Sequence, residues 1–134
     1  METRWLRRFS TVALAESLKH PAYPNTVLES LENVEVAVVS DAVIADVHKR
    51  FMNIPGATDV ITFDHGEILI SADTARDNAL KYGKHLDHEI GLYIIHGLLH
   101  LNGYTDKIPA EARKMHELQD EILAACLKSK DCLH

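Results

Sequence analysis

Two histidines and one carboxylate in the last third of the chain have the residue types and the spacing of metal ligands. His96 and His100 are four residues apart, so on a helix both imidazoles project from one face, about one turn apart. That spacing suits two ligands of a single ion. Gly103 can adopt the left-handed conformation that ends a helix, and the chain can then return Asp106 towards the ion. Three protein ligands with an open fourth position are typical of a catalytic zinc site, whereas a structural site uses four.

A single helical histidine is more often a core or surface residue than a ligand, and a pair adds little. The joint pattern of two histidines, a glycine at the helix end and a following carboxylate favours the metal site. Asp106 is the weakest member, because an aspartate before Lys107 and Pro109 could equally cap the last helix. We therefore predict one divalent ion per chain, zinc by preference, with other divalent metals as alternatives.

The residue that follows the first histidine limits what the ion could do. In the protease motif H-E-x-x-H this position holds a glutamate that acts as general base, and here it is Gly97. A coordinated water can still reach a pKa of roughly 7 and act as a nucleophile. Its proton acceptor must come from elsewhere, and the sequence identifies no general base. This pattern disfavours a conventional metalloprotease without excluding hydrolysis of another bond.

The elements that must position these residues are predicted from apolar periodicity and from cap and turn residues. Alternation and β-branching predict strands over 34–39, 58–63 and 67–70, the last two joined as a hairpin. Helical spacing predicts five helices, over about 5–19, 41–51, 72–83, 86–101 and 110–127. We expect an α+β fold: one domain over residues 1–134, with a small mixed β-sheet of about four strands packed with about five helices. The metal site would lie at the end of a central helix.

Composition bounds the class of protein. The chain has 134 residues, a net charge of −6 and no apolar run of the roughly 20 residues that a membrane span needs. The charge argues against a protein that holds nucleic acid by bulk charge, since such binding rests on many Lys and Arg contacts to phosphate. Any RNA contact would have to be local, or assisted by a metal or a larger assembly. Cys126 and Cys132 form no CxxC pair, and a reduced, cytoplasmic setting is the simplest interpretation.

Three segments resemble one known family. The run His96-Gly-Leu-Leu-His-Leu-Asn-Gly-Tyr-Thr-Asp106 is similar to the H-G-x-L-H-L-x-G-Y-D-H signature of the YbeY family, the bacterial metal-dependent rRNA maturation factors. Thr58-Asp-Val-Ile-Thr-Phe63 and Gly66-Glu-Ile-Leu-Ile-Ser71 are similar to its T-D-V-L-S-F and G-D-I-x-I-S segments. The order and spacing agree from about Val34 to Leu123. The histidine motif is quite specific, and the two strand motifs are supportive only.

The resemblance implies more than the residues themselves do. It implies a compact α+β fold with a zinc at the end of a cleft, single-strand-specific endoribonuclease activity, and a role in 16S rRNA 3′-end processing and ribosome quality control. Expected partners are therefore rRNA and the small ribosomal subunit, with ribosome-associated proteins as further candidates, and neither DNA nor a membrane. Thr58, Asp59 and Arg50 are the candidate residues of the substrate cleft.

Three departures from the family pattern qualify this expectation. The family's third histidine ligand falls on Asp106, and a carboxylate is also an accepted zinc ligand. The family's Tyr-Arg pair before the T-D-V-L-S-F strand falls on Phe51 and Met52, so that Arg is lost, and Arg50 lies two positions away. The first helix also starts almost at Met1, where family members have a short strand before it.

Two alternatives to the nuclease stay open from the sequence. One is a ribosome-associated binding or assembly factor whose metal is structural or vestigial, which the acidic charge and the missing Glu and Arg favour. The other is a metallopeptidase-like hydrolase, for which a glutamate such as Glu67 or Glu89 would have to reach the metal.

Overall fold

A computed structural model of the chain describes residues 3–129 and contains a three-stranded sheet and six helices within them. The elements in chain order are α1 (Thr3–Leu18), α2 (Val27–Ser30), β1 (Glu35–Val39), α3 (Asp41–Met52), β2 (Val60–Phe63), β3 (Glu67–Ser71), α4 (Ala72–Tyr82), α5 (Leu86–Leu101) and α6 (Pro109–Lys128). The predicted α+β class is confirmed. None of the helices in this described part of the chain is long and apolar enough to cross a membrane.

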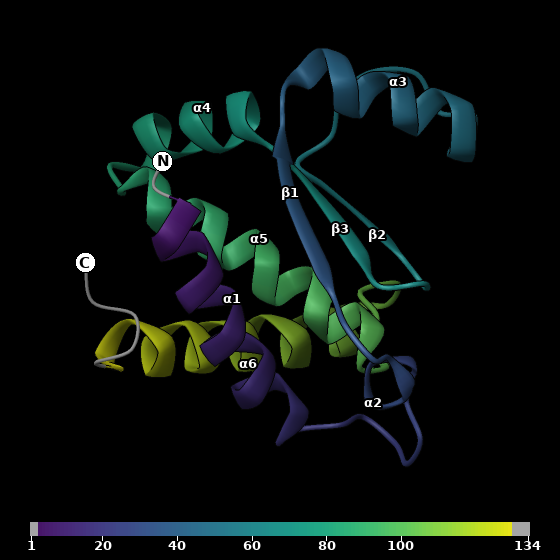
Figure 1. Cartoon of the computed structure of the whole chain (residues 1–134), viewed down its shortest axis with the longest axis vertical. Helices are drawn as coiled ribbons and strands as arrows, with labels where there is room; N and C mark the ends of the chain where they lie inside the picture. The colour runs from purple at the N-terminus through teal and green to yellow at the C-terminus, as the bar shows by residue number, and fades with distance from the viewer. Residues whose placement is uncertain (1–2, 130–134) are drawn as a thin grey trace.

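The sheet is mixed, and its strand order is β1-β3-β2. β1 runs parallel to β3, and β2 pairs with β3 as the predicted antiparallel hairpin. Because side chains alternate along a strand, each face of the sheet has its own core. Ile68 and Ile70 of β3 belong to the main core with α5, whereas Ile61 and Leu69 pack with Ile44 of α3 on the opposite face. Figure 1 shows α3 and α5 on opposite sides of the sheet.

α5 is the central helix of the fold. It packs against α1, α4, α6 and the sheet (Figure 1), and most of its residues are buried, while His96 and His100 are partly exposed on one face. Two glycines allow this close approach. A Cβ atom at Gly91 would lie 2.6 Å from Cζ of Phe9, and one at Gly97 would lie 2.9 Å from Oγ1 of Thr62. Gly97 therefore has a packing role in the place where the protease motif carries its base.

Local polar residues and one glycine fix the ends of the helices. The hydroxyl of Ser40 accepts a hydrogen bond from the backbone N–H of Val43, and Ser71 caps α4 in the same way through Thr74. Gly83 ends α4 in the left-handed conformation, with φ of +64°. These bonds satisfy N–H groups that a helix start otherwise leaves without partners.

The element counts differ from the expected ones at two places. Within residues 3–129 the sheet has three strands rather than about four, and no strand precedes α1. The sixth helix, α2, is a single turn of four residues, which is too short to show helical periodicity. It forms because Thr26 and Glu29 make a reciprocal capping box.

Candidate metal centre

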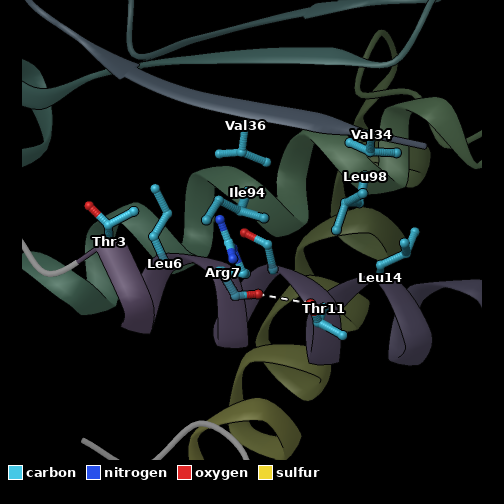
Figure 2. A pocket seen from close by; sticks show the side chains of 10 residues that line it. Thr3, Leu6, Arg7, Thr11, Leu14, Val34, Val36, Ile94 and Leu98 are labelled. Atoms are coloured by element: carbon cyan, nitrogen blue, oxygen red, sulfur yellow. Dashed lines mark hydrogen bonds between the residues drawn. The ribbon is translucent and has the colours of Figure 1, made fainter.

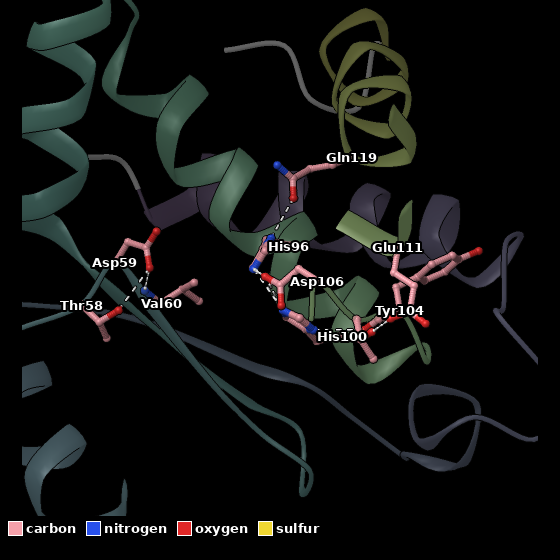
Figure 3. A network of polar contacts seen from close by, with 10 residues as sticks. Thr58, Asp59, Val60, His96, His100, Tyr104, Asp106, Glu111 and Gln119 are labelled. Carbon is pink, nitrogen blue, oxygen red and sulfur yellow. Dashed lines mark hydrogen bonds and ion pairs between the residues drawn. The ribbon is translucent and has the colours of Figure 1, made fainter. Parts of the chain in front are cut away.

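The last turn of α5 brings the two histidines together. Their ring centroids are 4.5 Å apart and nearly perpendicular, and the two Nε2 atoms are 3.0 Å apart. Asp106, in the loop between α5 and α6, places Oδ2 3.9 Å from Nε2 of each histidine (Figure 3). The structure thus brings together all three residues that the sequence predicts as metal ligands.

The loop after α5 reverses the chain so that Asp106 faces the histidines. Gly103 has φ of +98°, and a Cβ atom there would lie 2.5 Å from Cε2 of Tyr23. The backbone N–H of Tyr104 bonds to the carbonyl of Leu99, 3.0 Å away, and closes the helix end. Asp106 does not cap α6, because the N-cap residue is Ile108 and it makes no side-chain cap bond. The capping interpretation of Asp106 is therefore wrong.

The partners of the histidine Nδ1 atoms leave both Nε2 atoms directed at the shared site. Nδ1 of His100 donates to the backbone carbonyl of Tyr104 at 3.0 Å, and a carbonyl can only accept. Nδ1 of His96 lies 2.9 Å from Oε1 of Gln119 and donates to it. Burial is the main cause that lowers the pKa of His96, so this imidazole stays neutral near pH 7. Neutral imidazoles with a free Nε2 lone pair are the form that binds metals.

The donor geometry fits one ion. Zinc bonds of about 2.0–2.1 Å in a tetrahedral site separate neighbouring ligand atoms by roughly 3.3–3.4 Å. The distance between the two Nε2 atoms, 3.0 Å, is slightly shorter than this spacing. The distance from Oδ2 of Asp106 to each Nε2, 3.9 Å, is slightly longer. The Asp106 side chain is 49% exposed and lies on a loop, so a small movement closes the longer contacts. Two histidines and one carboxylate also leave positions open, as a catalytic site requires.

A cleft of about 270 Å³ lies beside His96 and His100, bounded on its other side by β2 and the end of α3. Asp59 is part of its wall, and Oδ1 of this residue accepts hydrogen bonds from the N–H of Val60 at 2.8 Å and from Thr58 at 3.3 Å. The other residues lining it are Met52, Val60, Ile61, Thr62, Asp64 and Leu101. Of the three candidate cleft residues, therefore, only Asp59 lines it.

Neither Thr58 nor Arg50 is among the residues that line the cleft. The hydroxyl of Thr58 donates a hydrogen bond to Oδ1 of Asp59, at 3.3 Å. Arg50 is 61% exposed and forms an ion pair with Asp46, with Nε 2.9 Å from Oδ2. Met52 lies in the cleft wall at the position where the family resemblance expects an arginine.

A second cavity, of about 320 Å³, lies between α1, β1 and α5 (Figure 2). Its walls are mainly aliphatic, with Leu6, Ile94 and Leu98 among them, and Arg7 is the charged side chain beside it. No histidine or carboxylate lines this cavity. Of the two cavities, therefore, only the cleft has histidines and carboxylates in its walls.

Gln119 is a site residue that the sequence argument missed. It lies on α6, 23 positions after His96, and is only 4% exposed. A signal was present, because Met115, Ile122 and Cys126 form the buried face of this helix and Gln119 falls on the same face. A polar residue within an apolar stripe needs a buried hydrogen-bond partner. Here that partner is the ring of His96.

We predict that Gln119→Leu weakens zinc binding by about 10- to 100-fold, since outer partners of a metal-bound histidine typically carry that much affinity. Leucine keeps the apolar volume but cannot accept the Nδ1–H of His96. Competition with a chelating indicator dye measures the affinity, and Gln119→Glu, which keeps an acceptor, is the matched variant. Equal zinc affinity in the wild type and Gln119→Leu would contradict this role.

Comparisons with known proteins give one consistent result. The model of a protein family described as Endoribonuclease YbeY matches residues 3–127. An endoribonuclease YbeY of Acholeplasma laidlawii is 41% identical over 100 residues, which cover 69% of this chain and 73% of the relative. The enzyme of the same name from Bacteroides thetaiotaomicron is 39% identical over 99 residues, covering 67% and 72%. The solution structure of TM1509 from Thermotoga maritima matches with a TM-score of 0.56 and 26% identity, covering 84% of this chain and 78% of that one.

Proposed function

This chain belongs to the endoribonuclease YbeY family, and from that premise we propose that it is a single-strand-specific, metal-dependent endoribonuclease. Its role is maturation of rRNA, with the 3′ end of 16S rRNA and ribosome quality control as the specific setting. One observation carries the proposal: two Nε2 atoms 3.0 Å apart, with a carboxylate oxygen 3.9 Å from both, at the edge of a cleft.

His96, His100 and Asp106 are the proposed ligands of one zinc ion per chain, and another divalent metal would use the same donors. When bound, such an ion supplies Lewis acidity towards a phosphoryl oxygen and activation of water. The protein's own part is to orient both imidazoles, through Gln119 and the Tyr104 carbonyl, so that their Nε2 atoms face the shared site.

The structure offers little support for the peptidase alternative. Glu67 and Glu89 do not line the cleft. Nε2 of His65 lies 3.5 Å from the Glu67 carboxylate, and Glu89 is buried at 6% exposure in α5 beside Tyr93. Asp59 and Asp64 are the carboxylates that do line the cleft, so proton transfer would have to involve one of them or solvent.

The rest of the proposal concerns setting and organisation. We place the protein in the cytoplasm, acting on rRNA of the small ribosomal subunit rather than on DNA. We also treat residues 1–134 as a single domain, because one continuous core joins α1, the sheet, α5 and α6. The net charge of −6 means that affinity for RNA must come from local contacts.

The test compares purified protein carrying one zinc per chain with the same protein after chelation. We expect cleavage of single-stranded rRNA fragments, little cleavage of the matching duplex, loss of cleavage on chelation and recovery with added zinc. Elemental analysis of the wild type and Asp106→Ala reports occupancy and the third ligand together. If chelation unfolds the protein and the zinc form shows no turnover, the binding-factor alternative replaces the nuclease.

A further inference from the structure

Three rings form a continuous row on the surface beside the cleft. Phe51 of α3 meets Phe63 of β2 edge to face, with centroids 5.8 Å apart. Phe63 stacks on His65 of the hairpin turn, at 5.3 Å and an interplanar angle of 15°. The guanidinium carbon of Arg50 lies 5.5 Å from the Phe51 centroid. We call Phe51, Phe63 and His65 the aromatic row.

The aromatic row adjoins the metal cleft. Met52 and Asp64 both line the cleft, and they directly follow Phe51 and Phe63 in the chain. Phe51 and Met52 end α3, where consecutive residues point about 100° apart, and Asp64 begins the turn that follows Phe63, the last residue of β2. The cleft and the aromatic row therefore adjoin at the end of α3 and at the turn after β2.

Exposure of Phe51 alone would not indicate a binding surface, since isolated apolar residues on a protein surface are normal. Tyr82 shows this, because it is 61% exposed with the Lys81 ammonium 5.3 Å from its ring, and neither residue lines the cleft. The aromatic row differs because it is a connected set of rings at the rim of the cleft. Phe51 is 65% exposed and the His65 side chain 68%, whereas Phe63 between them is partly buried against the core cluster around Ile44. The rings of Phe51 and His65 are therefore the exposed surfaces of the row.

We propose that the aromatic row is a stacking platform for unpaired bases of a single-stranded RNA whose backbone enters the metal cleft. This inference rests on the proposed nuclease function and adds how the substrate is held. Every nucleobase has a π face, so stacking on aromatic side chains binds single strands with little sequence preference. Bases within a duplex are already stacked and paired, so a platform of this kind discriminates against double-stranded RNA.

The charge of the protein favours bases as the occupant of this surface. With a net charge of −6, the chain cannot hold phosphates by bulk charge. Arg50 is already paired with Asp46 and lies near the Phe51 ring, so the row offers aromatic faces more than cationic charge. Stacking is the non-ionic contribution that an acidic RNA-binding protein requires.

The test measures binding of a fluorescein-labelled, ten-nucleotide 2′-O-methyl RNA, which is not hydrolysed, to the zinc-loaded protein by fluorescence anisotropy. Phe51→Ala should raise Kd about tenfold, within the roughly 5- to 150-fold range that corresponds to stacking of one base. Phe51→Leu should weaken binding similarly because it lacks a ring, whereas Phe51→Trp should bind as tightly as the wild type or more tightly. Tyr82→Ala is the matched control and should bind like the wild type.

The dependence of Kd on salt adds a second readout. Phe51→Ala should leave the slope of log Kd against log salt unchanged, because it removes no phosphate contact. The platform is overturned if Phe51→Ala or Phe51→Leu binds like the wild type, or if the wild type binds the oligonucleotide no better than its duplex. It is also overturned if Tyr82→Ala loses as much affinity as Phe51→Ala.

These experiments distinguish failure of the stacking platform from failure of the proposed nuclease function. If the wild type cleaves RNA with zinc and Phe51→Ala binds the oligonucleotide with the same Kd, the platform is overturned and the nuclease proposal stands. Binding that depends on Phe51, in a protein without any cleavage, would keep the platform and reject the nuclease. Phe51 is mostly exposed, so the thermal midpoint of Phe51→Ala should stay near that of the wild type.

Discussion

His96→Ala is expected to lose its zinc and to cut single-stranded RNA at least about 100-fold more slowly, since losing a ligand costs more than losing an outer partner. The variant keeps only His100 and Asp106, and two ligands do not complete the three-ligand set of a catalytic zinc site. Zinc per chain is measured by elemental analysis, and the cleavage rate is measured on a labelled rRNA fragment purified alongside a mock preparation.

His116→Ala is the matched control for this prediction. His116 is exposed on α6 and is not among the three residues that form the metal group. Its removal should leave zinc content and the cleavage rate unchanged. A His96→Ala protein that keeps the wild-type rate would show that the metal group is not the catalytic centre. Equal activity in the mock preparation would assign the cleavage to a contaminant.

The histidine pair was predictable because its geometry is local. Two residues four positions apart on an apolar helix must share a face, and a glycine three residues later marks where that helix ends. The helix caps at Ser40 and Ser71 were predictable for the same reason, since each depends on bonds within three residues. Local rules also gave the hairpin between β2 and β3.

Residues that depend on tertiary contacts were harder to place. Arg50 and Met52 are two positions apart on α3, so their side chains point about 200° apart. If Met52 lines the cleft, Arg50 must face nearly the opposite way, and it pairs with Asp46 there. The partnership of Gln119 with His96 spans two helices, and no spacing rule connects them. From the sequence, Gly97 indicated only that the general base of the protease motif is missing. In the structure, a Cβ atom at this position would clash with Thr62 and Ile68, because α5 lies too close to the sheet for a side chain.

Asn102→Ala is expected to destabilise the fold by about 2–3 kcal/mol, the upper part of the ~1–3 kcal/mol range for a buried polar group left without its partner, because two side-chain hydrogen bonds are lost. Asn102 is completely buried at the end of α5. Its side-chain N–H donates to the carbonyl of Ser17 at 2.7 Å, and its Oδ1 accepts from the hydroxyl of Thr26 at 2.8 Å. Its backbone carbonyl accepts from the N–H of Ala22 at 3.0 Å. One side chain thus ties α5 to the end of α1 and to the cap of α2.

The loss should appear as a thermal midpoint lowered by roughly 5–10 °C for a domain of this size. Asn102→Leu restores the volume without the hydrogen bonds, so it should remain destabilised, and a midpoint equal to the wild type would contradict the hydrogen-bond explanation. Asn102 lies between His100 and the loop that carries Asp106, so zinc affinity should fall as well. Saturating zinc should then raise the midpoint of Asn102→Ala, because a ligand that binds only the folded state stabilises it. The same zinc should leave His96→Ala unchanged, which separates a displaced metal loop from a missing ligand.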